Sequence, residues 1–242
     1  MVKGTVALKI FLPCFIDQGA PQLGGAVTAL LDHWGVPWEY PEDQTCCGQF
    51  AYTLGDFATA RRLARHFLRV FGTGEVLCPS ASCTYMVRHG YPQVMAEGRK
   101  GPAKGPWVWE LSEWLAARGA LPWMPMFNGT LVLHHSCKAR QLGILGAAAQ
   151  VLGQVSGLKL LTVSPYYTCC GFGGTFKFQN QELSILMGED YLEAVRATGA
   201  QGLVSLDYSC LLHLKEVAAG RGWDLQFYHL VEIISRGLGT GY

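Results

Sequence analysis

The sequence predicts an α/β protein made of two pseudo-repeated halves, each a small, mainly parallel sheet with flanking helices. Three observations predict this fold. Apolar runs typical of strands alternate with segments of helical periodicity. The same order of these segments occurs twice along the chain. The cysteines recur at one fixed offset, which marks an internal repeat. Strands that alternate with helices favour a parallel sheet.

The cysteine spacing defines the repeat. In each copy a first cysteine is followed by 31 residues, then by Cys-Cys-Gly, and later by a last cysteine. A shift of 123 positions carries Cys14 onto Cys137 and Gly48 onto Gly171. The repeated cysteines are Cys14, Cys46, Cys47 and Cys83 in the first copy and Cys137, Cys169, Cys170 and Cys210 in the second. The ninth cysteine, Cys78, stands outside the pattern, and we interpret it as a core residue.

The first half contains five expected elements before its last cysteine. They are a strand at 6–12, a helix near 24–34, a short strand at 37–40, a helix at 56–71 and a strand at 75–77. The helix at 56–71 has apolar residues at helical spacing, and Asp56 is its expected N-cap. We expect Cys83 to open a further helix.

The second half repeats this order. We expect a strand at 130–134, a helix near 140–155, strands at 158–163 and 202–206, a helix at 181–198, and a helix opened by Cys210. The stretch 98–125 is rich in Pro, Gly and Trp and contains one helix-like piece at 109–118, so we interpret it as the connection. The expected domains are residues 1–123, the first repeat with the connecting segment, and residues 124–242, the second repeat.

Composition excludes several classes of function. The formal net charge is +1, and no basic run is longer than a pair such as Arg61-Arg62, so neither nucleic-acid binding nor a polybasic membrane patch is expected. No apolar stretch reaches the length of a spanning helix, and the start of the chain predicts a buried strand and not a signal peptide. We expect a cytoplasmic protein whose membrane association, if any, is peripheral and runs through partners.

The cysteines predict a metal site. In parallel sheets, ligands bind beyond the carboxyl ends of the strands, and three segments in each half deliver cysteine there. An odd number of cysteines without an export signal argues against a disulfide framework. Four thiolates match a [4Fe–4S] cluster and also a four-cysteine zinc site. Adjacent cysteines are awkward ligands for one tetrahedral ion, which favours iron–sulfur; zinc and thiol redox chemistry stay open.

Other side chains near the cysteines carry weaker predictions. His134 and His135, at a strand end beside Cys137, are interpreted as packed or hydrogen-bonding residues. His213 is the better candidate ligand, because helical spacing places it near Cys210. The glycine of each Cys-Cys-Gly tolerates positive φ, and neighbouring N–H groups could point at sulfur. The loop Gly171–Gly174 lacks the residues of a nucleotide-binding fingerprint.

The motifs resemble the cysteine-rich CCG family. The segments that carry the resemblance are Thr45–Gln49, Pro79–Thr84, Leu133–Cys137 and Cys169–Phe176, and it covers essentially the whole chain. The family includes the cysteine-rich subunit of heterodisulfide reductase, the iron–sulfur subunit of glycolate oxidase and lactate-utilisation proteins, which this chain resembles most. The resemblance implies an electron-transfer subunit, itself without assigned catalytic residues, in an oxidoreductase complex. That complex oxidises L-lactate, or a related 2-hydroxy acid such as glycolate, to the 2-oxo acid. Its partners include a ferredoxin-type iron–sulfur protein, and a quinone or membrane chain accepts the electrons.

One departure from the family pattern bears on the chemistry. The heterodisulfide reductase subunit ends each motif with Cys-x-x-Cys. Here Ser80 and Met86 flank Cys83 at three residues, and Asp207 and His213 flank Cys210. Four cysteines per half fit simple electron transfer better than disulfide cleavage. A zinc-bound scaffold and a thiol or heterodisulfide reductase remain the alternative functions.

Overall fold

Two four-stranded sheets form the framework of the protein. The computed structural model describes residues 7–96, 105–164 and 169–238. The first sheet has the order β2-β1-β3-β4 and the second the order β6-β5-β7-β8. All strand pairs are parallel. The strands are β1 (Leu8–Ile10), β2 (Trp38–Glu39), β3 (Glu75–Cys78), β4 (Trp107–Glu110), β5 (Met126–Leu133), β6 (Ser156–Leu161), β7 (Gly202–Ser205) and β8 (Gln226–His229). The identical strand order confirms the two pseudo-repeated halves.

Helices connect the strands in both halves. The first half contains α1 (Cys14–Gly19), α2 (Pro21–His33), α3 (Gln49–Thr53), α4 (Phe57–Phe71), α5 (Ala81–Tyr85), the π-helix η1 (Met86–Gly90), α6 (Tyr91–Ala96) and α7 (Leu111–Ala116). The second contains α8 (Cys137–Leu142), α9 (Leu145–Leu152), α10 (Phe176–Gln179), α11 (Gln181–Ala197), α12 (Tyr208–Gly220) and α13 (Leu230–Ile234). None of the helices within these described residues is long and apolar enough to cross a membrane.

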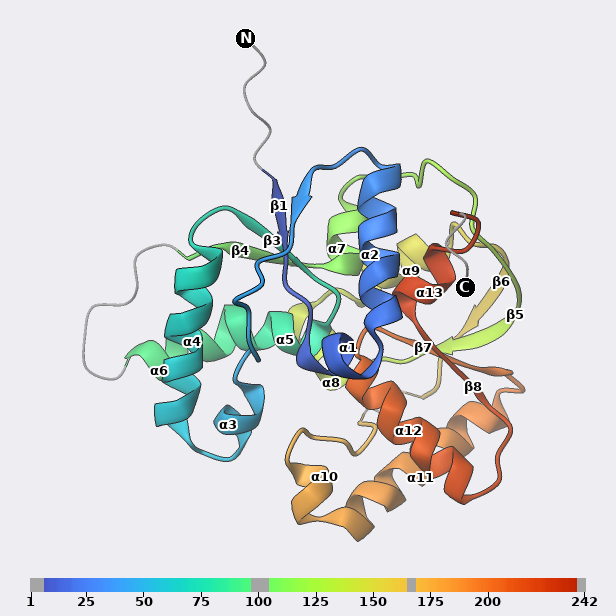
Figure 1. Ribbon diagram of the computed structural model, residues 1–242. Coiled ribbons are helices and arrows are strands. Elements are labelled where there is room, and N and C mark those ends of the chain that lie inside the picture. Colours follow the sequence, from blue (N-terminus) through green and yellow to red (C-terminus); the bar gives the residue numbers. More distant parts are fainter. Residues whose placement is uncertain (1–6, 97–104, 165–168, 239–242) are drawn as a thin grey trace.

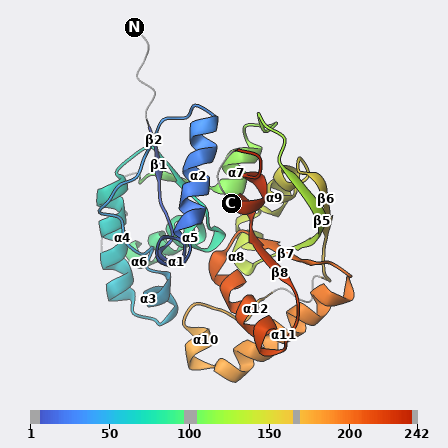
Figure 2. The ribbon, with the colours of Figure 1, turned by 45° about the vertical axis from the view of Figure 1, so that its right-hand side comes forward.

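The two halves share one core. Helices α2, α7, α9 and α13 lie between the two sheets (Figure 1, Figure 2), and their buried residues form a single cluster with the inward side chains of β1 and β5. Successive strand residues point to opposite faces, so Leu131 and Leu133 join this central core while Val132 joins the outer one. Helices α4 and α6 cover the outer face of the first sheet, and α11 and α12 that of the second. Burial on both faces explains the near-continuous apolar strands.

Most expected elements are present with shifted ends. The helix at 56–71 is confirmed as α4, and the Asp56 side chain accepts a hydrogen bond from the backbone N–H of Thr59 at 3.0 Å. The expected helices near 24–34 and 140–155 are each preceded by a short extra helix that starts at the first cysteine. In the second half the break falls at Gly143, whose φ of +72° ends α8.

Two edge strands are not evident from the sequence. In the stretch interpreted as the connection, the expected helix-like piece is present as α7, but β4 is an addition: where the stretch is described, Trp107 to Glu110 pair with β3 over its whole length. Strand β8 pairs with β7 in the equivalent place. Both strands are four residues long and end in a buried ionisable residue, Glu110 or His229, so their apolar runs stop after three and two residues. The boundary between residues 123 and 124 stays a prediction.

Candidate metal centre

All eight repeated cysteines line one cavity between the two halves. Strands β1 and β3 end just before Cys14 and Cys83, and β5 and β7 end just before Cys137 and Cys210. The Cys-Cys pairs follow β2 and β6 at a greater distance along the chain. Because the carboxyl ends of parallel strands meet at one edge of a sheet, each half gathers four thiols there. We call Cys14, Cys46, Cys47 and Cys83 the first thiol group, and Cys137, Cys169, Cys170 and Cys210 the second.

The thiols of each group contact one another. In the first group, Cys46 accepts hydrogen bonds from the thiols of Cys14 and Cys47, and Cys47 also contacts Cys83. The second group has the same arrangement: Cys169 accepts from Cys137 and Cys170, and Cys170 contacts Cys210. These two sets of neighbours are the sets that the cysteine spacing defines.

These contacts split the thiol pKa values. Hydrogen bonds from the Cys14 and Cys47 thiols lower the pKa of Cys46 to about 3, and the corresponding bonds lower that of Cys169 to about 2. The pKa of the donating thiols is raised instead. For Cys14 and Cys137 the causes are the hydrogen bond to the neighbouring sulfur and burial. Each group thus favours one thiolate shared among protonated neighbours. A bound cation or cluster would release the remaining protons.

The glycine after each Cys-Cys pair shapes the ligand loop. Gly48 and Gly171 have φ values of +86° and +87°, which only glycine adopts freely. Their N–H groups donate to the sulfur two residues earlier, Cys46 Sγ at 3.4 Å and Cys169 Sγ at 3.5 Å. Such N–H···S hydrogen bonds stabilise thiolate sulfur and tune the potential of iron–sulfur clusters. The expectation of donors aimed at sulfur is confirmed.

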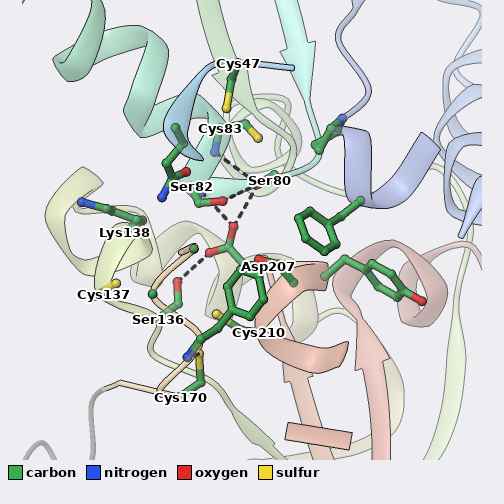
Figure 3. A pocket seen from close by; sticks show the side chains of 18 of the residues that line it. Cys47, Ser80, Ser82, Cys83, Ser136, Cys137, Lys138, Cys170, Asp207 and Cys210 are labelled. Carbon is green, nitrogen blue, oxygen red and sulfur yellow. Dashed lines mark hydrogen bonds between the residues drawn. The ribbon is translucent and has the colours of Figure 1, made fainter. Parts of the chain in front are cut away.

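Asp207 lies between the two thiol groups (Figure 3). Its carboxyl group accepts hydrogen bonds from Ser80 Oγ at 2.9 Å, the backbone N–H of Ser82 at 2.8 Å and Ser136 Oγ at 2.9 Å. Ser80 and Ser82 belong to the first half, whereas Ser136 and Asp207 belong to the second. From the sequence, Asp207 stands out only as the residue in place of a cysteine. Its position three before Cys210, matching Ser80 before Cys83, was the available signal.

Of the two histidines, His134 lies at the cavity and His213 does not, whereas the sequence favoured His213 as a ligand. His134 is fully buried and lines the cavity, and a ring nitrogen lies within 4.8 Å of the sulfurs of Cys170 and Cys210. Burial lowers the pKa of His134 to about 4, so the imidazole is neutral. His213 instead bonds through Nε2 to the carbonyl and hydroxyl oxygens of Ser184, at 3.1 and 3.2 Å. It is not among the residues that line the cavity.

Cys78 and Met86, the two other sulfur-containing residues singled out in the sequence, lie in the first half. Cys78 is fully buried, as expected of a core residue, yet its thiol also contacts that of Cys83. Met86 is buried in the outer core of the first half.

Three rings from both halves, Phe15, Phe50 and Phe172, pack against one another at the cavity, with centroid distances of 5.5 to 6.3 Å. They supply an apolar wall for the site.

This donor set fits iron–sulfur clusters. Each half offers four neighbouring sulfurs, backbone N–H donors to sulfur, and apolar shielding, which are the features that bind and tune such clusters. The residues that would hold a cluster are the four cysteines of each thiol group. Soft thiolates also suit zinc, so the donor set identifies a metal-binding centre without deciding between the two metals.

The comparisons with known proteins agree with this site. The model of the cysteine-rich domain CCG matches residues 8–88 and 131–215. Lactate utilization protein A 2 of Bacillus cereus is 31% identical over 238 residues, covering 96% of this chain and 98% of that protein. Lactate utilization protein A of Macrococcus caseolyticus is also 31% identical, covering 94% of this chain and 96% of that protein. A hypothetical protein from Helicobacter pylori shares the fold with a TM-score of 0.66 at 10% identity. The match covers 96% of this chain and about half, 49%, of the Helicobacter chain.

Proposed function

The chain belongs to the CCG family of cysteine-rich domain proteins, and on that premise we propose that it is an iron–sulfur electron-transfer subunit of a complex that oxidises L-lactate to pyruvate. The observation that carries this proposal is the pair of four-thiol groups lining one cavity. Relatives named for lactate utilization, similar over nearly their full length, support the substrate class. A related 2-hydroxy acid such as glycolate is the alternative substrate.

The geometry supports electron relay better than substrate chemistry. Oxidation of lactate to pyruvate releases two electrons and two protons. Two one-electron centres in one chain match that number, and a bound cluster in each half would supply the reversible one-electron step. The cavity wall consists mainly of cysteine, serine and aromatic side chains; its other polar residues are Asp207, His134, Lys138 and Gln49. We therefore assign hydroxy-acid oxidation to a partner subunit and place a ferredoxin-type protein among the other partners. Nine free cysteines fit a reducing compartment, so we place the complex in the cytoplasm.

Each residue type in the cavity has a defined part in this proposal. The eight cysteines bind the metal, and the N–H groups of Gly48 and Gly171 donate to ligand sulfurs. The three phenylalanine rings exclude water, which strengthens each of these electrostatic interactions. Asp207 holds the two halves at a fixed spacing through its hydrogen bonds from Ser80 Oγ and the Ser82 N–H of the first half. A fixed spacing keeps reorganisation small during electron transfer.

The test is reconstituted lactate oxidation with the partner subunits. We expect C46S/C47S and C169S/C170S each to abolish lactate-dependent reduction of an artificial acceptor that takes electrons from this subunit. Cys78→Ala is the matched control, because Cys78 is a fully buried cysteine outside the repeat, and it should keep most of the activity. If a redox-inert zinc form supports the same rate, the chain is a scaffold. If the protein instead reduces small heterodisulfides, the reductase alternative holds.

A further inference from the structure

The residues that stand beside the four repeated cysteines differ between the two halves. Counted from the repeated cysteines, His134 stands where the first half has Phe11, and Ser205 stands where the first half has Cys78. Phe11 packs against the rings of Phe67 and Phe71, at 5.0 and 5.5 Å, and offers no donor. In the second half the same place holds a polar pair, since His134 Nδ1 lies 3.0 Å from Ser205 Oγ. Both residues are fully buried.

The second ring nitrogen of His134, Nε2, makes no hydrogen bond to the residues that the structure describes, although the atom is buried. Leaving a buried polar atom unpaired costs about 1–3 kcal/mol, which calls for an explanation. His134 lines the cavity, and a ring nitrogen lies within 4.8 Å of the sulfurs of Cys170 and Cys210. The free nitrogen is therefore available to the second thiol group.

The hydrogen bonds of Ser205 decide which nitrogen carries the proton. Ser205 Oγ accepts the backbone N–H of Asp207 at 3.2 Å, and its only other partner among the described residues is His134 Nδ1. The hydroxyl proton is fully buried, so it must donate to Nδ1 or go unpaired. An Nδ1 that accepts holds no proton of its own. The ring proton of His134 is then on Nε2, which makes this atom a donor and not a lone-pair metal ligand.

From this arrangement we propose that His134 donates an Nε2–H···S hydrogen bond to the sulfur of the second metal centre, a tuning contact that the first centre lacks. The inference deepens the proposed function and rests on it. A hydrogen bond to ligand sulfur favours the state with more negative charge, which is the reduced one. His134 is therefore a positioning residue that makes the second-half centre easier to reduce than it would be with phenylalanine. Ser205 fixes the tautomer, as partners of metal-site histidines do.

The experiment compares three variants by anaerobic redox titration followed by EPR. We expect H134F, which copies Phe11, to keep its iron and sulfide but to lower the potential of the second-half centre. At the potential where that centre of the wild type is half reduced, the ratio of oxidised to reduced form should rise about tenfold, which corresponds to 59 mV for one electron. H134Q places an amide donor near the position of Nε2 and should restore most of the potential. H135F, at the neighbouring half-buried histidine outside the cavity lining, should change nothing.

Two results with H134F would overturn the inference. One is an unchanged potential in H134F. The other is loss of the iron and sulfide of the second half alone in H134F, which would make the imidazole a ligand. A separate measurement uses the wild-type protein without metal. ¹⁵N NMR of this apo-protein reports the tautomer of His134. We expect Nε2–H; the Nδ1–H tautomer contradicts the inference. Wild-type protein that takes up no iron would refute the proposed function, while the tautomer would still decide the direction of the hydrogen bond.

Discussion

Ser80 Oγ donates a hydrogen bond to the carboxyl group of Asp207 at 2.9 Å, and the two residues occupy equivalent positions of the two halves. Each stands three residues before the last repeated cysteine, just after the third strand of its half. The bond therefore crosses the pseudo-symmetric interface at the point where the two thiol groups approach (Figure 3). Ser136 Oγ, from the second half, binds the other carboxyl oxygen of Asp207 at 2.9 Å.

Removing this carboxyl group should weaken the join between the halves. In D207N the amide nitrogen cannot accept, so at least one of these hydrogen bonds is lost or must reverse, and we expect the free energy of unfolding to fall by about 1–3 kcal/mol in chemical denaturation. S80A should cost about 1 kcal/mol. S136A is the matched control, because Ser136 Oγ also donates to Asp207 and also accepts a backbone N–H at a helix start, but lies in the same half as Asp207. A loss in S80A that is clearly smaller than the loss in S136A would show that the bond across the interface contributes little.

The two ligand-loop glycines should differ in their tolerance of alanine. Both have positive φ, which costs about 1–2 kcal/mol for alanine. A Cβ on Gly48 would meet the Leu63 side chain at 3.3 Å, whereas one on Gly171 would lie 2.3 Å from the backbone oxygen of Ser184. We expect G171A to lose clearly more stability than G48A, and to bind less metal. Denaturation midpoints of the pair test this, and equal losses would contradict it.

Glu110 should make stability depend on pH. Burial raises the pKa of this carboxyl group to about 8, and Ser112 bonds to it through both N–H and hydroxyl. The unfolded chain releases the proton near pH 4.5 and the folded chain near pH 8, so the folded state binds more protons between these values. Stability from this group is present below pH 4.5 and is lost as pH rises towards 8, by about 1.4 kcal/mol per unit.

The variant E110Q isolates this effect, because the amide does not titrate. We expect the difference in unfolding free energy to move in favour of E110Q as pH rises from about 5 to about 8. Urea denaturation of both proteins at several pH values measures it. Parallel profiles would mean that Glu110 is already ionised in the folded protein.

The apo-protein should carry one unusually reactive thiolate in each half. Hydrogen bonds from neighbouring thiols lower the pKa of Cys46 to about 3 and that of Cys169 to about 2, and neither residue is fully buried. Their alkylation by iodoacetamide should be nearly independent of pH from about 5 to about 8. Cys137 is the control: it is also only partly buried, but its pKa is raised, so its labelling should be slow. Peptide mass spectrometry reads all three, and uniform labelling would contradict the shared-thiolate arrangement.

The position of the cysteines could be predicted from the sequence because it depends on local patterns. Cysteine spacing and the alternation of strands and helices are enough to place Cys14, Cys83 and their equivalents at strand ends. The missed features depend on contacts between distant segments. Strand β4 is defined by its pairing with β3, and Asp207 acquires its role only when Ser80 approaches from the other half. His134 lines the cavity and His213 does not, which the sequence could not reveal for the same reason: Ser184, on a separate helix, forms the hydrogen bonds of His213 Nε2.

The measurement that tests the central claim most directly is iron, zinc and acid-labile sulfide analysis, with EPR, of anaerobically prepared protein. If each half holds a [4Fe–4S] cluster, wild type should contain about eight irons and eight sulfides per chain. C46S/C47S and C169S/C170S should each retain about half of both. Stoichiometric zinc without iron or sulfide would contradict the account, and it would leave the eight cysteines as ligands of a structural site.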